Sequence, residues 1–275
     1  MAVEPLKTID AHIHLDKYEG NDLAAVLAEI GREGGVEAVV AVSVNLASCE
    51  ANRALAERHP GRILPAYGFH PEQPIPPEDE LDKLFAWIEA HADSAAAVGE
   101  VGLPYYRRRE AEAKGERFDL EPYMELLDRF AALAVKLDVP LALHCVYDDA
   151  AAACAVLEKR GVAKAHFHWY KGDDRTTERI AANGWFISVT PDVLYEAEIR
   201  KIAAVYPLSQ LMAETDGPWP YEGKFAGRMT VPSMTRDVVA EIATIRGMDE
   251  LEVSRILHEN ARLFYGSGKP AKTGA

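Results

Sequence analysis

Apolar runs rich in β-branched residues alternate along this chain with longer segments rich in Ala, Leu and Glu. Such alternation of strands with amphipathic helices is typical of a parallel sheet covered by its crossover helices. Eight strands followed by a helical C-terminus predict an α/β fold, a (β/α)8 TIM barrel that occupies residues 1–275 as a single domain. An open, doubly wound sheet is the alternative. The expected strands cover residues 6–15, 36–45, 62–70, 95–103, 139–146, 163–170, 184–190 and 208–216.

The length of the chain agrees with this fold, and its composition indicates the cellular compartment in which it works. The 275 residues fall within the size range of one α/β barrel. The N-terminal segment lacks the apolar stretch of a signal peptide, and no apolar run approaches the roughly 20 residues of a membrane-spanning helix. Cys49, Cys145 and Cys154 show no CxxC spacing, which argues against a disulfide framework. We therefore expect a cytoplasmic protein that does not contact a membrane.

The charge of the chain limits how it can bind nucleic acid. Its net charge is −14, whereas proteins that hold duplexes by their phosphates usually present a basic surface. A phosphate-bearing substrate would therefore need a local group of basic residues, or bound cations, to overcome the overall field.

The segment TIDAHIHL, residues 8–15, places an acid and two imidazoles at alternate positions of the first strand. Alternate residues of a strand share a face, so we expect Asp10, His12 and His14 to point the same way. Imidazole is a common ligand of divalent metals. The motif by itself fits a metal site or a hydrogen-bonded pair of core histidines equally well.

Further chemically active side chains fall near the ends of later predicted strands. The third strand ends at His70, the fourth contains Glu100 near its end, and the fifth ends around His144. The sixth and eighth strands supply the remaining members, His166, His168 and Asp216. Because active sites of TIM barrels lie at the carboxyl ends of the strands, we expect these groups to meet at one rim. Four imidazoles and two carboxylates would suit Zn²⁺ or Mn²⁺ better than an all-oxygen Mg²⁺ site.

Taken in order, these motifs resemble the TatD family of metal-dependent hydrolases, within the amidohydrolase-like barrels. The resemblance extends over nearly the whole chain and rests on the sequence segments DAHIHL, GFHPE, GEVGL, LHC, HWYKG, ETDGPW and NARLFYG. It implies two divalent ions, Zn, Mn or Mg, and a water activated between them. In this interpretation Asn260 and Arg262, in the last motif, have structural roles.

The resemblance also implies a role for each of the rim residues. His12 and His14 would bind one metal, and His144 and His168 the other. Glu100 would bridge the two ions, and Asp216 would complete the first site and take the proton of the reactive water. His168 fits the His-x-x-x-Gly spacing of the family, which leaves His166 behind the ligands. The predicted metal ligands are therefore His12, His14, Glu100, His144, His168 and Asp216, and the predicted catalytic residues are Asp216 and Glu100.

Candidate substrate contacts are His70, Arg107, Lys171 and Trp219. The family often has a substrate-contacting histidine at the position of His70, although a turn histidine before proline fits equally well. Arg107, with the two arginines that follow it, would either grip phosphate or belong to a solvated charged insertion. Four aromatic residues near strand ends would stack on a base or simply pack, namely Tyr67, Trp169, Trp219 and Tyr221.

Two departures from the family pattern bear on the substrate. Pro104 stands where an aspartate is usual, and Val146 where an arginine or lysine commonly follows the histidine. The resemblance implies a deoxyribonuclease that cleaves phosphodiester bonds, and a barrel mouth favours single-stranded ends. The missing cation at Val146 keeps open an amidase or lactonase that acts on a small ester or amide. A metal-stabilised binding protein without catalysis is the third alternative.

Overall fold

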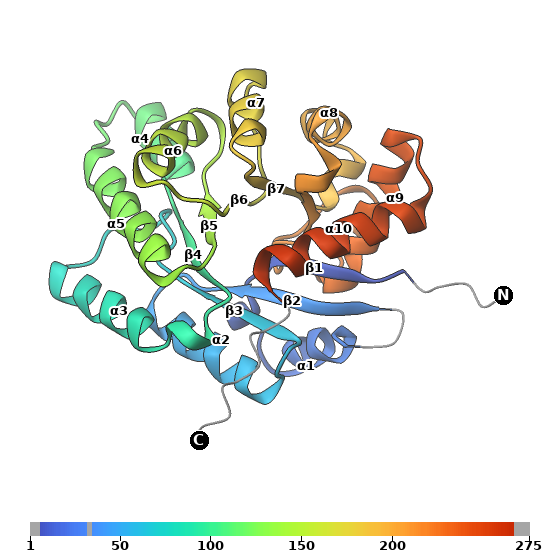
Figure 1. Cartoon of the computed structure of the whole chain (residues 1–275), viewed down its shortest axis with the longest axis horizontal. Coiled ribbons are helices and arrows are strands. Elements are labelled where there is room, and N and C mark those ends of the chain that lie inside the picture. Colours follow the sequence, from blue (N-terminus) through green and yellow to red (C-terminus); the bar gives the residue numbers. More distant parts are fainter. Residues whose placement is uncertain (1–5, 32–34, 267–275) are drawn as a thin grey trace.

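The computed structural model describes residues 6–31 and 35–266. Eight parallel strands form one sheet in the order β1 to β8, each paired with its neighbour in sequence. Helices surround this sheet (Figure 1). The prediction of a TIM barrel is therefore confirmed. The strands are β1 (Thr8–Ile13), β2 (Val36–Val42), β3 (Ile63–Tyr67), β4 (Ala97–Gly102), β5 (Leu141–His144), β6 (Ala165–Phe167), β7 (Phe186–Val189) and β8 (Leu211–Ala213).

The helices follow the predicted alternation, with two of them between β4 and β5 and two after β8. They are α1 (Gly20–Glu29), α2 (Leu46–Arg58), α3 (Glu78–Ala90), α4 (Tyr105–Ala113), α5 (Glu121–Leu137), α6 (Tyr147–Arg160), α7 (Asp174–Ala182), α8 (Ala197–Val205), α9 (Thr235–Arg246) and α10 (Glu250–Tyr265). Short 3-10 helices include η1 (Leu15–Lys17), η3 (Pro191–Leu194) and η4 (Leu208–Gln210). Within the described residues, no helix combines the length and apolar character needed to cross a bilayer.

Helix α5 shows how the sequence pattern becomes packing. The stripe Leu126, Leu127, Phe130 and Leu133 has helical spacing, and all four side chains are buried. Fully burying an apolar side chain of this size contributes roughly 1.5–3 kcal/mol. The helix ends at Asp138, whose φ of 52° places it in the left-handed region that stops helices. One face of the helix therefore covers the outside of the sheet.

The sheet closes into a near-complete barrel between β1 and the segment after β8. The Asp216 N–H donates to the His12 carbonyl at 2.9 Å, and the His14 N–H donates to the Gly217 carbonyl at 2.8 Å. Asp10 reinforces the closure, because its carboxylate accepts hydrogen bonds from the backbone N–H and the hydroxyl of Thr215. The seam of the barrel therefore lies directly beneath the predicted ligands.

The expectation that Asp10 shares a face with His12 and His14 is wrong. Asp10 pairs with Val39 but Ile13 pairs with Ala41, so β1 contains one extra residue in this interval. Such a bulge interrupts the alternation of side chains. His12 and His14 still point into the barrel, whereas the Asp10 carboxylate binds Thr215 at the seam.

The floor of the barrel is closed by the last helix. Phe264 and Tyr265 of α10 pack with Met212, Ala142 and other small inward-facing residues. The amide of Asn260 donates to the carbonyls of Leu208 and Leu211 and so fixes α10 beside β8. Arg262 pairs with Glu259 on the same helix. Cys49, Cys145 and Cys154 are buried and free.

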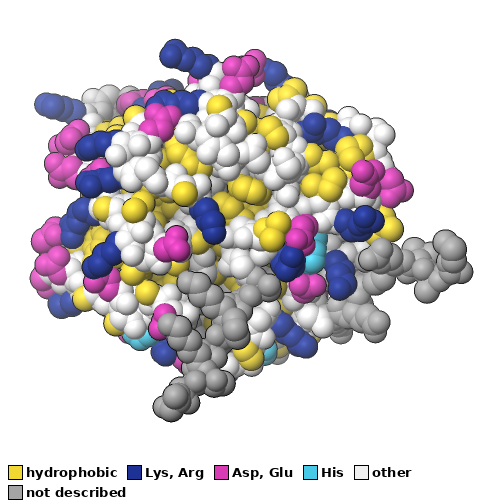
Figure 2. Space-filling model, viewed as in Figure 1, with side chains coloured by type: hydrophobic (Ala, Val, Ile, Leu, Met, Phe, Trp, Pro, Cys, Tyr) yellow, Lys and Arg dark blue, Asp and Glu magenta, His cyan; other side chains and the backbone are white. Residues whose placement is uncertain are grey.

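Charged side chains of both signs are interspersed over the face shown in Figure 2. Many charged side chains of the described residues form pairs on or between helices, for example Lys83 with Asp79 and Arg179 with Glu158. Isolated exposed pairs of this kind contribute little to stability. Several buried imidazoles and carboxylates, in contrast, lie at the carboxyl end of the barrel, among them His12, Glu100 and His168.

Candidate metal centre

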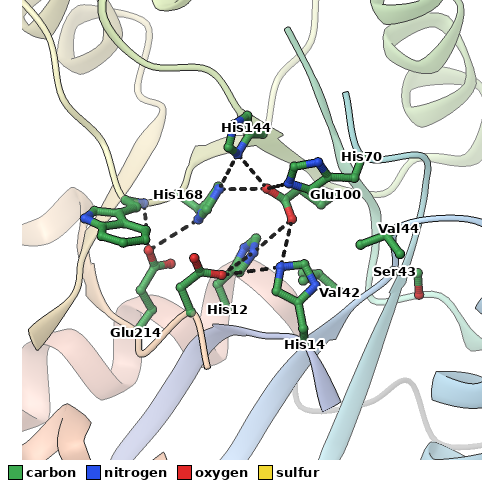
Figure 3. A network of polar contacts seen from close by, with 12 residues as sticks. His12, His14, Val42, Ser43, Val44, His70, Glu100, His144, His168 and Glu214 are labelled. Carbon is green, nitrogen blue, oxygen red and sulfur yellow. Dashed lines mark hydrogen bonds and ion pairs between the residues drawn. The ribbon is translucent and has the colours of Figure 1, made fainter. Parts of the chain in front are cut away.

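The six predicted ligands converge at the carboxyl ends of the strands. Figure 3 shows five of them, His12, His14, Glu100, His144 and His168. His12, Glu100 and His144 lie within the last residues of β1, β4 and β5, whereas His14, His168 and Asp216 follow the ends of β1, β6 and β8. All six are buried. The parallel direction of the strands is what brings groups so distant in sequence to one rim.

Four donor atoms from this group face one point without being hydrogen-bonded to one another. Glu100 Oε2 lies 3.2 Å from His12 Nε2 and 3.3 Å from His14 Nε2, and Asp216 Oδ1 lies 3.5 and 3.4 Å from the same nitrogens. His12 Nε2, Glu100 Oε2 and Asp216 Oδ1 are buried without a hydrogen-bond partner. Ligands held at roughly 2.0–2.1 Å from a tetrahedral Zn²⁺ stand about 3.3–3.4 Å apart. The spacing of these atoms therefore fits a divalent cation.

The other oxygen of Glu100 faces a second group. Oε1 is 2.7 Å from His168 Nε2 and 3.0 Å from His144 Nδ1, and the two nitrogens are 3.1 Å apart. His70 Nε2 stands slightly farther from the same oxygen, at 3.4 Å. One carboxylate thus presents each of its oxygens to a different set of imidazoles. These histidine and carboxylate clusters suit divalent metal binding.

The electrostatics of the site keep its acids ionised. Burial alone would raise the pKa of Glu100, but the surrounding imidazoles of His70, His168 and His12 hold it well below its usual value. Burial opposes protonation of His14, but the nearby carboxylates of Asp216 and Glu100 outweigh it and raise the pKa of His14 to about 9. The pKa of His12 is lowered, chiefly by burial. Ionised carboxylates and imidazoles are ligand types that a divalent cation can bind in place of these protons.

Two acids that the sequence analysis missed hold the imidazoles in place. Glu72 Oε1 lies 3.3 Å from His144 Nε2, and Glu214 Oε1 lies 3.5 Å from His168 Nδ1. Glu214 is also within reach of His12 as a possible ligand. Its oxygens, however, already accept hydrogen bonds from the Trp169 N–H and the Ser188 hydroxyl. Each missed acid stands two residues from a predicted site residue, in the segments GFHPE and AETD, and this proximity was the available signal.

His166 lies behind the predicted ligands, on the floor side. Its Nε2 is 2.6 Å from the Ser188 hydroxyl and its Nδ1 is 2.5 Å from the Tyr265 hydroxyl. Ser188 in turn donates to Glu214. The imidazole therefore belongs to a buried hydrogen-bond chain that runs from the last helix to the carboxylate beside His168.

A cavity of about 860 Å³ opens above the six converging residues. Its lining includes all four predicted substrate contacts, His70, Arg107, Lys171 and Trp219, together with Lys17, Tyr106 and Tyr195. Three aromatic side chains are exposed there, and Trp219 is the most exposed of them at 56%. Tyr67 and Tyr221, in contrast, are buried and pack within the protein.

The basic residues at this opening differ in whether other side chains already contact their charged groups. Arg107 donates to the Tyr123 hydroxyl and stands over the rings of Phe118 and Tyr123. Lys171 lies 4.8 Å from the centre of the Trp169 ring and 4.0 Å from Asp192 Oδ2. Lys17, which the sequence analysis did not single out, is exposed.

The segment after β4 forms helix α4, and its other two arginines are engaged in ion pairs. Arg108 reaches Asp148 and Asp149 of α6 at 2.8 Å, and Arg109 pairs with Glu112 on α4 itself. The two departures from the family pattern both precede helices. Pro104 is the N-cap of α4, and Val146, which is buried and lines the cavity, is the N-cap of α6.

Comparison with known proteins agrees with this geometry. Residues 9–266 match the family model described as TatD related DNase. The chain is 36% identical to an uncharacterized metal-dependent hydrolase of Haemophilus influenzae, over 93% of this chain and 98% of the relative. It is 28% identical to the 3'-5' ssDNA/RNA exonuclease TatD of Pantoea vagans, over 85% of this chain and 90% of the relative. A TatD family hydrolase from Entamoeba histolytica superimposes with a TM-score of 0.81 at 20% identity, covering 96% of this chain and all of that one. The chain therefore belongs to the TatD family of metal-dependent hydrolases.

Proposed function

We propose that this TatD-family hydrolase is a deoxyribonuclease that uses two divalent ions to cleave phosphodiester bonds at the ends of single strands. The observation that carries the proposal is the position of Glu100, whose two oxygens face separate sets of imidazoles at 3.2 and 2.7 Å. Divalent cations in such a site lower the pKa of a coordinated water and withdraw charge from a scissile phosphoryl or carbonyl group.

The protein residues then have distinct tasks. Glu100 is fully buried and bridges the two sets of ligands. His12 and His14 complete one set with Asp216, and His144 and His168 complete the other. The side chain of Asp216 is 11% exposed and that of Glu100 is not exposed. Asp216 is thus the acid that meets water entering from the cavity, and we assign to it the acceptance of the proton during attack.

His70 is suited to donate a hydrogen bond to the substrate. Its Nδ1 accepts the backbone N–H of Glu72 at 3.1 Å, so the neutral ring carries its hydrogen on Nε2. Burial lowers the pKa of His70 to about 4 and keeps the ring neutral near pH 7. An uncharged donor beside Glu100 can hold a non-bridging oxygen of a phosphodiester without repelling a neighbouring cation.

The exposed aromatic residues around the cavity support a single-stranded substrate. Tyr106, Tyr195 and Trp219 come from three separate segments that border the opening. Unpaired bases stack on such side chains, and a duplex does not expose the faces of its bases. Lys17 and Lys171 line the same cavity and would lie near a bound phosphate chain. The names of the family model and of the Pantoea relative agree with this substrate class.

The test is release of nucleotides from end-labelled DNA by protein loaded with Zn²⁺, Mn²⁺ or Mg²⁺. We expect cleavage of a single strand, slower cleavage of the matched duplex, and none after chelation of the metal. Asp216→Asn is the control for contaminating nucleases. No cleavage of DNA with any of the three metals, and none of a small phosphodiester, would refute the nuclease.

A small ester or amide is the second candidate substrate. It is favoured because the arginines near the cavity already bind other side chains and are not free to hold a phosphate. The guanidinium groups of Arg107 and Arg108 bind Tyr123, Asp148 and Asp149, and Val146 offers no charge. The same site would attack a carbonyl group equally well. A panel of lactones, amides and phosphodiesters distinguishes the two enzymes. A metal-loaded protein that cleaves none of them would be a binding protein.

A further inference from the structure

Glu72 connects three segments of the barrel rim through one carboxylate. It follows β3, two residues after His70, and its side chain is only 16% exposed. Oε1 accepts the Tyr106 N–H at 2.8 Å, Oε2 accepts the Arg107 N–H at 2.8 Å, and Oε1 is also 3.3 Å from His144 Nε2. The partners therefore belong to the first turn of α4 and to the end of β5.

The contact with His144 bears on which ring nitrogen can bind a cation. Nδ1 of His144 faces Glu100 Oε1 and His168 Nε2, at 3.0 and 3.1 Å. A neutral imidazole carries one N–H, so Nδ1 can be a ligand only when the hydrogen is on Nε2. A carboxylate at Nε2 accepts that hydrogen and stabilises this tautomer, as acids behind ligand histidines do in general.

The contacts with α4 replace a cap that the helix lacks. Pro104 is the N-cap residue and provides no side-chain acceptor. The N–H groups in the first turn of a helix need acceptors, and a negative charge is favoured there. Glu72 supplies both oxygens from the loop after β3. Through this contact it holds Tyr106, which is 49% exposed at the cavity, beside His144 with the ring centroids 6.1 Å apart.

We propose that Glu72 is a positioning residue that uses one carboxylate to set the tautomer of His144 and to seat α4 at the mouth of the site. Its carboxylate links α4, which borders the cavity, to His144 of the second set of predicted ligands. The same residue fixes His70 through its backbone N–H, but a change of side chain leaves that bond in place. The proposal rests on the metal centre proposed above.

The test compares Glu72→Gln and Glu72→Ala with Glu125→Gln, an exposed acid on α5. Cation affinity is measured by competition with a chromophoric chelator. The seating of α4 is measured by the rate of trypsin cleavage at Arg107, Arg108 and Arg109. The tautomer of His144 is read from long-range proton–nitrogen correlation spectra of the metal-free protein. The spectra are recorded at a pH high enough for the ring to be neutral, because Glu100 and Glu72 outweigh burial and raise the pKa of His144.

We expect Glu72→Ala to weaken cation binding by about 10–100-fold, the usual effect of removing an acid behind a ligand histidine. We also expect faster cleavage within α4 and loss of the predominant Nε2–H signal of His144. Glu72→Gln, which preserves size, should change all three in the same direction even if the alanine variant does not fold. Arg108→Ala removes the contacts of α4 with Asp148 and Asp149. It should increase cleavage but leave cation affinity within about threefold, since Glu72 still holds His144.

Either of two results would overturn the proposal. The first is a folded Glu72→Gln variant whose cation affinity and His144 spectrum match those of Glu125→Gln. The second is faster cleavage of α4 with both of those readouts unchanged, which would make Glu72 a helix cap only. A parent protein that binds no cation in the same assay would instead refute the proposed metal centre.

Discussion

The imidazoles of His12 and His168 stack face to face, with their ring centroids 3.8 Å apart and 10° between their planes. Despite this contact, the two rings direct their Nε2 atoms to different oxygens of Glu100. Two imidazoles from β1 and from the segment after β6 therefore face different oxygens of one carboxylate.

Replacing Glu100 tests whether that carboxylate bridges two ions. Glu100→Gln leaves one acceptor oxygen and introduces an NH₂ donor, which cannot ligate a cation. We expect the variant to retain at most one cation per chain and to lose activity on the order of 10³-fold, since several kcal/mol of charge stabilisation are removed. Metal content after gel filtration, with Glu125→Gln as control, measures the first effect. Two cations in the variant would exclude the bridge.

Asp216→Asn separates catalysis from metal binding. The amide oxygen can still face the ligands of the first set, but the group no longer accepts a proton. We expect kcat to fall by about 10²–10⁴-fold, the usual range for a general base, while cations remain bound. Calorimetric titration with the metal, alongside turnover of the best substrate, provides both values. Full activity in this variant would assign the proton transfer elsewhere.

Trp219→Ala tests the stacking surface at the cavity. Stacking of one base on an aromatic side chain contributes about 1–3 kcal/mol, which corresponds to a loss in kcat/KM of about 5–150-fold. The loss should appear in KM for a single-stranded oligonucleotide and be small for a phosphodiester without a base. Trp219→Phe should restore much of it, and Val205→Ala, an exposed residue of α8, is the control. Equal losses on both substrates would argue against base stacking.

The stability of the metal-free protein should carry a pH signature from Asp149. Burial raises the pKa of this acid to about 6, against the opposing effect of Arg108. Because the folded-state pKa exceeds the unfolded value, the stabilising contribution of Asp149 is complete below the unfolded pKa. It is lost as the pH rises through 6. Between pH 4.5 and 7 the free energy of unfolding should fall by about 2 kcal/mol relative to that of Asp149→Asn.

Urea unfolding of both proteins at the two pH values, in the presence of EDTA, measures this difference. A difference between parent and variant that does not change with pH would mean that Asp149 titrates normally in the folded state.

The order of elements and the convergence of the predicted ligands could both be read from the sequence. Apolar runs at the spacing of strands, each followed by an amphipathic segment, predict a barrel. Since parallel strands end at one rim, His12, His144 and Asp216 could be placed together without coordinates. The same reasoning predicted the buried stripe of α5, because helical spacing is a local property of the chain.

Contacts between distant segments could not be read in this way. The bulge in β1 takes Asp10 away from His12, and it depends on the register with β2 and on the closure with Thr215. Apart from its closeness to His70, nothing in the sequence distinguishes Glu72 from other acids, because its bonds to the Tyr106 and Arg107 N–H groups form only when α4 packs beside the loop after β3. The partners of Arg107 and Arg108 lie on α5 and α6, so their engagement also depended on packing.

The sequence by itself determined the barrel, the rim and the identity of the residues gathered there, because strand periodicity and chain direction are encoded locally. Only the tertiary structure decided which oxygen of Glu100 faces which imidazole, which acids stand behind the ligands, and which basic residues remain at the cavity. Those outcomes depend on the orientation of side chains from separate strands and helices. That orientation is set by packing and hydrogen bonding across the fold, which no local pattern specifies.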